Sequence, residues 1–160
     1  MKIGKVIYEM TKYYAGDIKR INHFLKVYAY AKTIGEMEQL DEKTQEILEV
    51  TAVVHDIGIK VSEEKYGSSA GHYQQIEGPV VAKPMLYNLG YDEAFIERVL
   101  YLIAHHHTYH DMDGLDYQIL VEADFLVNLN EEEAQKATIE NVLKNIFRTR
   151  SGIEILHHCF

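Results

Sequence analysis

The chain has only one cysteine, two prolines and ten glycines in 160 residues. A lone cysteine, Cys159, excludes an internal disulfide framework and is typical of a reducing compartment, so we expect a cytoplasmic protein. The scarcity of proline and glycine favours long helices over a turn-rich β architecture. No apolar stretch is long enough to span a bilayer, and the start of the chain mixes charged with apolar residues, unlike a signal peptide.

The charge of the chain is strongly negative. Acidic residues outnumber basic ones by 25 to 16, which gives a formal net charge of −9 at pH 7. Such a charge argues against binding to nucleic acid duplexes or anionic membranes. A phosphorylated small molecule or nucleotide would need a metal ion or a few well-placed cations. The hydrophobic content of 47% is ordinary for a globular protein, and the length predicts a single domain, residues 1–160.

Apolar residues recur at helical spacing along most of the chain, which predicts an all-α bundle. Asp17, Asp41 and Asp92 each stand where an N-cap should begin a helix. The segments 60–77 and 108–114 are polar and predicted to be loops, with Pro79 starting the helix after the first of them. The predicted helices cover residues 3–14, 17–35, 41–58, 79–90, 92–107, 116–129 and 131–147, the last with a solvated acidic start.

Two histidines and two aspartates interrupt the apolar pattern of three predicted helices. His23 lies beside the apolar face of one helix, His55-Asp56 stands where a second should end, and Asp124 has apolar neighbours in a third. Taken singly, each has a structural explanation, such as a hydrogen-bonded core histidine or a cation at a helix C-terminus. Because unpaired polar groups are costly to bury, one shared divalent cation explains all four. This nitrogen and oxygen set suits manganese, iron, magnesium, nickel or zinc, and the identity stays open.

The order of these residues resembles that of the HD-domain superfamily of metal-dependent phosphohydrolases. The resemblance covers about residues 15–130 and rests on the segments Arg20-x-x-His23-x-x-x-Val27, Val54-His55-Asp56-Ile57-Gly58 and Val121-Glu122-Ala123-Asp124. It implies a single-domain helical bundle with a divalent cation at its centre. In that bundle His23, His55, Asp56 and Asp124 would be the metal ligands, and the last predicted helix would pack on the motif-bearing region.

Further histidines lie between the His-Asp pair and the last aspartate. His72 and the triplet His105-His106-His107 resemble second-metal ligands of the dinuclear branches, so His72, His105 and His106 are candidates for a second metal or for substrate binding. The histidine that those branches place near Gln74 is absent, which favours one tightly bound metal. Alternatively, the triplet complements a helix dipole at the surface. Helical spacing turns His106 inward, places His105 beside it and leaves His107 the most solvent-facing.

The function that we expect is hydrolysis of a phosphate ester or anhydride by a metal-activated water. Asp56 would orient the water, and His105 or His106 would protonate the leaving group or hold the phosphate. Arg20 and Lys60 are the cations expected to bind phosphate. Two alternatives stay open, a non-catalytic metal-bound module for ligand sensing or interaction and a di-iron oxygenase on the same fold. Coordination positions that face a cleft would favour an enzyme.

Overall fold

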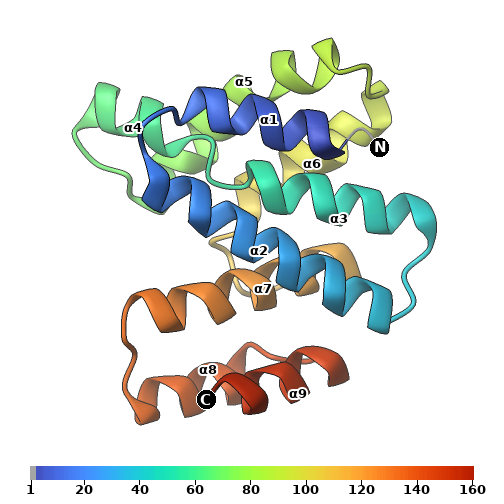
Figure 1. Ribbon diagram of the computed structural model, residues 1–160, viewed down its shortest axis with the longest axis vertical. Coiled ribbons are helices and arrows are strands. Elements are labelled where there is room, and N and C mark those ends of the chain that lie inside the picture. Colours follow the sequence, from blue (N-terminus) through green and yellow to red (C-terminus); the bar gives the residue numbers. More distant parts are fainter. Residues whose placement is uncertain (1–2) are drawn as a thin grey trace.

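The protein is all-helical over residues 3–160, the part of the chain that this computed structural model describes (Figure 1). No strand occurs in that range, which confirms the all-α prediction. None of the described helices is both long and apolar enough to cross a membrane. In chain order the helices are α1 (Ile3–Tyr13), α2 (Ile18–Met37), α3 (Glu42–Val54), α4 (Ile59–Tyr66), α5 (Gly71–Asn88), α6 (Glu93–His105), α7 (Leu115–Glu131), α8 (Lys136–Asn145) and α9 (Arg150–Cys159).

Three aspartates begin helices α2, α3 and α6 as N-caps, as the sequence predicts. Each side chain accepts a hydrogen bond from the backbone N–H three residues later, at 3.2 Å for Asp17, 2.9 Å for Asp41 and 2.8 Å for Asp92. These bonds satisfy N–H groups that the first turn of a helix leaves without an intrahelical partner. The starts of these helices are therefore determined by local chemistry.

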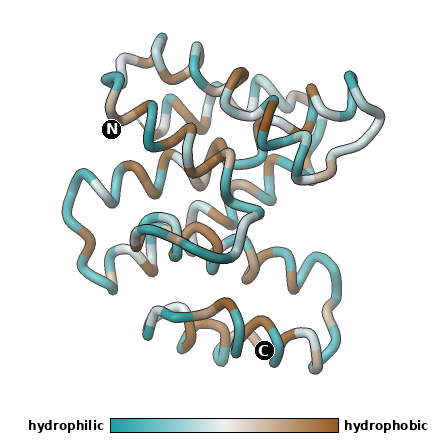
Figure 2. Tube along the Cα trace, turned by 180° about the vertical axis from the view of Figure 1, so that it is seen from behind, coloured by the Kyte–Doolittle hydropathy of each residue, from teal (hydrophilic) through white to brown (hydrophobic). Residues whose placement is uncertain are grey.

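Helices α2, α3 and α7 form the centre of the fold (Figure 1). Helix α2 packs against both α3 and α7, and α3 also contacts α1 and α6. Figure 2 shows apolar and polar residues alternating along the helices, as expected when each helix buries one face. Most of α7 is buried, including the carboxylates Glu122 and Asp124. Charged groups inside the core need partners, so α7 is where a functional site is expected.

The segment 60–77 is largely helical, so its prediction as a loop was wrong. Helix α4 begins directly after the His-Asp turn and ends at Gly67, whose φ of 66° is the left-handed conformation that glycine adopts readily. Helix α5 already begins at Gly71, so Pro79 lies inside this helix and not at its start. Only a four-residue connection separates α4 from α5, and Gly67 is its one glycine.

Two features hold α4 and α5 in place, one between the two helices and one between α5 and the turn after α3. Lys65 and Tyr66 of α4 donate hydrogen bonds to the buried Glu77 carboxylate of α5, at 3.1 and 2.7 Å. A Cβ atom at position 58 would lie 2.8 Å from the backbone nitrogen of Gly78, so α5 approaches the turn after α3 at backbone distance. Gly58 is the last residue of the predicted helix 41–58, and in the structure it lies in the turn between α3 and α4. Its φ of −76° suits any residue, and the close approach is what requires glycine there.

The C-terminal region contains two short helices where a single helix over 131–147 was predicted. Helix α7 extends to Glu131, and α8 and α9 follow it. The Glu122 carboxylate of α7 accepts hydrogen bonds at the start of α9 from the Thr149 hydroxyl at 2.6 Å and the Thr149 backbone N–H at 3.0 Å. A Cβ atom on Gly152 would collide with this carboxylate. Glycine thus allows α9 to pack directly on the central helix α7.

Candidate metal centre

The end of α3 presents two adjacent ligand-type side chains. His55 is fully buried, and its Nδ1–H donates a hydrogen bond to the carbonyl oxygen of Ala52 at 2.7 Å. In the neutral ring this bond leaves Nε2 unprotonated and free to bind a cation. The Tyr14 hydroxyl donates to the carbonyl oxygen of Asp56 at 2.7 Å. Tyr14, the residue directly after α1, therefore holds the turn from which the Asp56 side chain projects.

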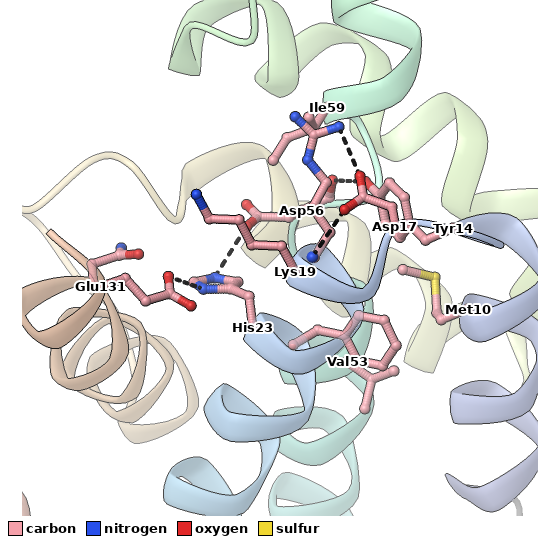
Figure 3. Close-up of a pocket in the computed structure, with 12 residues that line it drawn as sticks. Met10, Tyr14, Asp17, Lys19, His23, Val53, Asp56, Ile59 and Glu131 are labelled. Atoms are coloured by element: carbon pink, nitrogen blue, oxygen red, sulfur yellow. Dashed lines mark hydrogen bonds and ion pairs between the residues drawn. The ribbon is translucent and has the colours of Figure 1, made fainter.

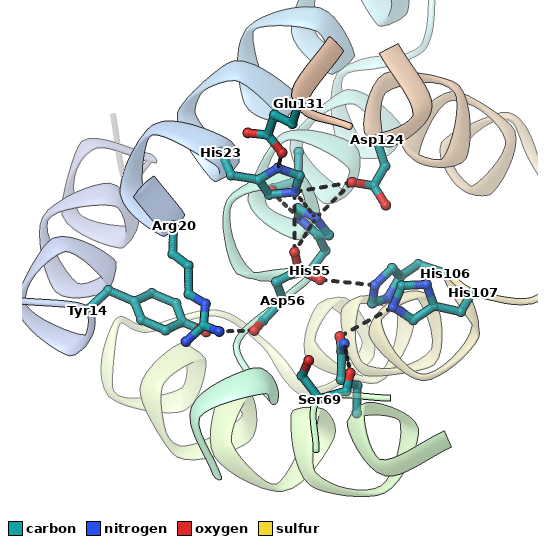
Figure 4. A network of polar contacts seen from close by, with 12 residues as sticks. Tyr14, Arg20, His23, His55, Asp56, Ser69, His106, His107, Asp124 and Glu131 are labelled. Carbon is teal, nitrogen blue, oxygen red and sulfur yellow. Dashed lines mark hydrogen bonds and ion pairs between the residues drawn. The ribbon is translucent and has the colours of Figure 1, made fainter. Parts of the chain in front are cut away.

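His23 of α2 and Asp124 of α7 meet this pair at the centre of the fold (Figure 4). The Nε2 atoms of His23 and His55 lie 3.3 Å apart. Asp124 Oδ1 lies 3.2 Å from the Nε2 of His23 and 3.3 Å from that of His55. Asp56 Oδ2 lies 3.3 and 3.2 Å from the same two nitrogens. The structure thus brings together the four residues predicted to be metal ligands.

One buried oxygen of the cluster lacks the hydrogen bond that such an atom normally makes. Asp124 Oδ1 has no hydrogen-bond partner within the described residues, although both imidazoles approach it at ion-pair distance. Two imidazole nitrogens that face each other repel unless a proton or a cation lies between them. His23, His55 and Asp124 each offer a ligand atom, and these atoms lie within 4.8 Å of one another. The residues therefore fit a divalent cation, and ligation itself stays a prediction.

The electrostatics of the metal-free cluster favour positive charge between its carboxylates. Burial lowers the pKa of His23, but Asp124 and Asp56 outweigh burial and raise it to about 10. Burial opposes the charged form of His55 too, but the same carboxylates hold its pKa well above the ordinary value. Burial raises the pKa of both aspartates, but the imidazoles hold it well below the usual range. A bound cation would take over the role of the imidazole protons.

His106, which follows α6, approaches Asp56 from another side. Its side chain is buried, and its Nδ1–H donates to the carbonyl oxygen of Ile103 at 2.7 Å. Its Nε2 lies 3.3 Å from Asp56 Oδ1, the oxygen that does not face the other two imidazoles, and has no hydrogen-bond partner within the described residues. His55, Asp56 and His106 form a second group whose ligand atoms lie within 4.8 Å. His106 can therefore act as a further ligand or as a proton donor.

The other predicted histidines belong to neither group of candidate ligands within the described residues. His105 donates from Nδ1 to the carbonyl oxygen of Tyr101 at 2.7 Å, and the two rings stack with their centroids 4.0 Å apart. His72 is exposed on the first turn of α5. His107, expected to face solvent, is half-buried with its Nε2 3.3 Å from the side-chain oxygen of Gln74, and burial lowers its pKa to about 4. Roles for His72 and His105 stay predictions, and this geometry does not favour them.

An open pocket of about 370 Å³ lies beside the cluster (Figure 3). His23 and Asp56 line it together with residues of α1, α2 and α7. A small phosphorylated molecule fits a pocket of this size, which is at the lower end of the range for ligand sites. A cation held by His23 and Asp56 would therefore be reachable from solvent.

The cations around the pocket differ in how far acidic groups compensate them. Arg20 makes two hydrogen bonds to Glu63, at 3.0 and 2.9 Å. Lys19 also lines the pocket but has no hydrogen bond or ion pair within the described residues. Lys60 does not line the pocket, and its Nζ donates to the main chain of Tyr13 at 3.3 Å. Of the two cations predicted to bind phosphate, Arg20 lines the pocket and Lys60 does not. Lys19, which was not predicted, lines it as well.

Glu131 is a neighbour of the cluster that sequence reasoning missed. It was interpreted as part of a solvated helix start, but it is the last residue of α7, and its Oε1 lies 2.8 Å from His23 Nδ1. A signal was available, because Asp124, Asn128 and Glu131 recur at helical spacing and so share one face of a helix. Asn128 and Glu131 both line the pocket.

The fold and the site define a class, an all-α protein whose buried histidines and aspartates can hold a metal beside an open pocket. Within that class the family is clear, because the HD domain model matches residues 20–145, and the chain belongs to this family. The crystal structure of a predicted HD superfamily hydrolase from an uncultured Thermotogales bacterium has a similar fold, with a TM-score of 0.64. That protein is 22% identical in sequence, and the match covers 98% of this chain and 82% of that one. No curated protein matches the chain.

Proposed function

We propose that this protein is a metal-dependent hydrolase that cleaves a phosphate ester or anhydride of a small molecule or nucleotide. The observation that carries this proposal is that His23 and Asp56 line an open pocket, because a structural metal is normally closed off by its ligands. Membership of the HD domain family supports a metal-dependent reaction. The similarity to a protein described as a predicted HD superfamily hydrolase supports hydrolysis.

Asp56 is central to the proposed reaction. It would hold the divalent cation (manganese, iron, magnesium, nickel or zinc) together with His23, His55 and Asp124. When bound, such a cation supplies Lewis acidity toward water and phosphoryl oxygens. The two Asp56 oxygens face different partners, because Oδ2 faces the imidazoles of the cluster and Oδ1 faces His106. The carboxylate can therefore accept a hydrogen bond from a water molecule and orient it beside His106.

His106 is placed to move a proton. Its Nδ1–H is engaged by the carbonyl oxygen of Ile103, so Nε2 is the atom that exchanges protons. With a proton on Nε2, the ring can donate it to the leaving-group oxygen, and Asp56 Oδ1 lies 3.3 Å from that nitrogen. His105 is turned toward Tyr101 and has no such position.

Lys19 is the cation that we assign to the substrate phosphate. Its charge is uncompensated within the described residues, whereas Arg20 is already paired with Glu63 and with Asp17. Arg20 can still contribute, because its guanidinium lines the same pocket and offers several N–H donors. In an acidic protein, one uncompensated lysine beside the candidate metal site attracts a phosphorylated ligand to that site.

A screen of phosphorylated small molecules and nucleotides, each with the five metals in turn, tests the proposal by phosphate release. We expect at least one active pair of substrate and metal, and a loss of activity of about 100-fold or more in His55→Ala. The control variant His105→Ala, which alters a histidine outside the cluster, should stay active. If metal-loaded wild type binds such compounds but hydrolyses none, the protein is a ligand-sensing module. Consumption of oxygen would instead indicate a di-iron oxygenase.

A further inference from the structure

The three histidines that face the candidate metal centre are held in two different ways. His55 and His106 each donate from Nδ1 to a carbonyl oxygen three residues earlier in the chain, in both cases at 2.7 Å. Both follow the last residue of a helix, α3 and α6. Carbonyl groups in the last turn of a helix have no intrahelical partner, so they are available to a side chain. These two rings are therefore oriented by their own helix ends.

His23 is held in another way. It lies inside α2, where the carbonyl groups one turn earlier accept hydrogen bonds from the helix backbone. Its Nδ1 instead lies 2.8 Å from Oε1 of Glu131, and Figure 4 shows Glu131 on the side of the ring away from His55. An ionised carboxylate only accepts hydrogen bonds, so His23 donates from Nδ1. Its Nε2 is then left to face Asp124 and Asp56.

The carboxylate of Glu131 does not stabilise α7, the helix that it ends. Glu131 is the last residue of α7, and a negative charge at a helix C-terminus interacts unfavourably with the helix dipole. No lysine or arginine forms an ion pair with it within the described residues, where its ion-pair partner is His23. Its side chain is 24% exposed, so the carboxylate could have turned to solvent. The contact with His23 is what accounts for its orientation.

We propose that Glu131 is a positioning residue for the metal. It fixes the His23 ring with Nε2 toward the cation, and its charge strengthens His23 as a ligand, as a carboxylate does when it accepts from a metal-bound histidine. Helix α7 then contributes twice, with Asp124 as a ligand and with Glu131 as the support of a ligand on α2. The inference depends on the metal site that the proposed function also needs, but not on the nature of the substrate.

Cobalt binding to the metal-free full-length protein tests this role. The Kd for Co²⁺ is measured by titration, and its visible absorption bands report the ligand set. Glu131→Gln keeps an acceptor oxygen but removes the charge, and Glu131→Ala removes both. We expect Kd to rise about 10- to 100-fold in Glu131→Gln and more in Glu131→Ala. The matched control, Glu132→Gln, makes the same charge change at the next, exposed residue and should stay within about twofold of wild type.

Two further measurements separate positioning from folding. The metal-free Tm of Glu131→Gln should stay close to that of wild type, so that weaker binding is not a consequence of unfolding. Nitrogen-15 spectra of labelled histidine should show that His23 carries its proton on Nδ1 in the Co²⁺-loaded wild type. Equal Co²⁺ affinity and equal absorption spectra for Glu131→Gln, Glu132→Gln and wild type would overturn the proposal.

The outcome is distinguishable from a failure of the proposed function. Wild type that binds Co²⁺ about 10-fold or more tightly than Glu131→Gln, but hydrolyses no phosphorylated compound, supports the role of Glu131 and contradicts hydrolysis. A Glu131→Gln variant with wild-type affinity in an active enzyme contradicts the role of Glu131 alone. Wild type that binds no divalent metal contradicts both.

Discussion

Replacing Asp124 with asparagine removes one charge from the cluster with almost no change in side-chain volume. Asp124 is 5% exposed, and its Oδ1 lies 3.2 Å from the Nε2 of His23 and 3.3 Å from that of His55. Burial raises its pKa, but the two imidazoles hold the pKa well below its usual range. The carboxylate therefore stabilises the metal-free fold at neutral pH, and this contribution is lost as the pH falls through the folded-state pKa. The variant should start from a lower Tm, so only the metal-induced shift is diagnostic.

The expected size of that shift follows from mass action. A divalent metal at about 100 times its Kd stabilises the folded state by about 2.7 kcal/mol. Each kcal/mol raises Tm by about 2–4 °C in a domain of this size, so wild type should gain roughly 5–11 °C. If asparagine weakens binding about 100-fold, the same metal concentration only equals Kd. The stabilisation then falls to about 0.4 kcal/mol, a shift of roughly 1–2 °C.

The assay is thermal unfolding of wild type and of each variant, with metal and with chelator. Asp116→Asn is a matched control, because Asp116 is also a buried aspartate of α7 but pairs with Arg98 outside the cluster. Asp116→Asn should keep the full metal-induced shift even if its baseline Tm is lower. A shift in Asp124→Asn as large as that of wild type would refute the reasoning, because Asp124 would then not contact the ion.

His106→Ala should lower kcat about 100-fold or more and His105→Ala less than about threefold, because only His106 faces Asp56; equal kcat values would contradict this assignment. Metal affinity should rise with pH between about pH 6 and pH 9, because His23 has a pKa of about 10 in the metal-free protein and must lose its proton to bind. A flat profile in calorimetric titrations would be evidence against His23 as a ligand. Glu122→Ala should lower the free energy of unfolding by about 3 kcal/mol or more, because several buried donors lose their acceptor. A loss below about 1 kcal/mol in urea denaturation would show that these donors find another acceptor.

The helix starts were predictable where local chemistry decides them. Asp17, Asp41 and Asp92 each cap the helix that the sequence assigned to them, because a capping bond involves only residues within one turn. Helix α4 was missed because it is short and polar, and its contact with Glu77 of α5 is a tertiary one. Helix α9 was missed because Gly152 weakens its sequence signal, and the reason for that glycine is the distant Glu122.

The candidate ligands were predictable because unpaired polar residues on apolar helices require a common explanation. His23, His55 and Asp124 meet in the structure as that argument requires. The distinction between His105 and His106 was only partly predictable. Helical spacing turns His106 inward, but the stacking of His105 on Tyr101 depends on side-chain packing. Glu131 was missed because its partner lies on another helix, and only the packing of α2 against α7 brings the two together.

The distribution of the candidate ligands over α2, α3 and α7 has a consequence for folding kinetics. His23 lies on α2, and His55 and Asp56 lie in the turn directly after α3, whereas Asp124 arrives with α7 from much later in the chain. The complete site therefore exists only after α7 has docked. If docking of α7 follows the rate-limiting step of folding, a bound cation leaves the refolding rate unchanged and slows unfolding instead. Loading with metal would then extend the lifetime of the native state against proteases that attack the unfolded chain.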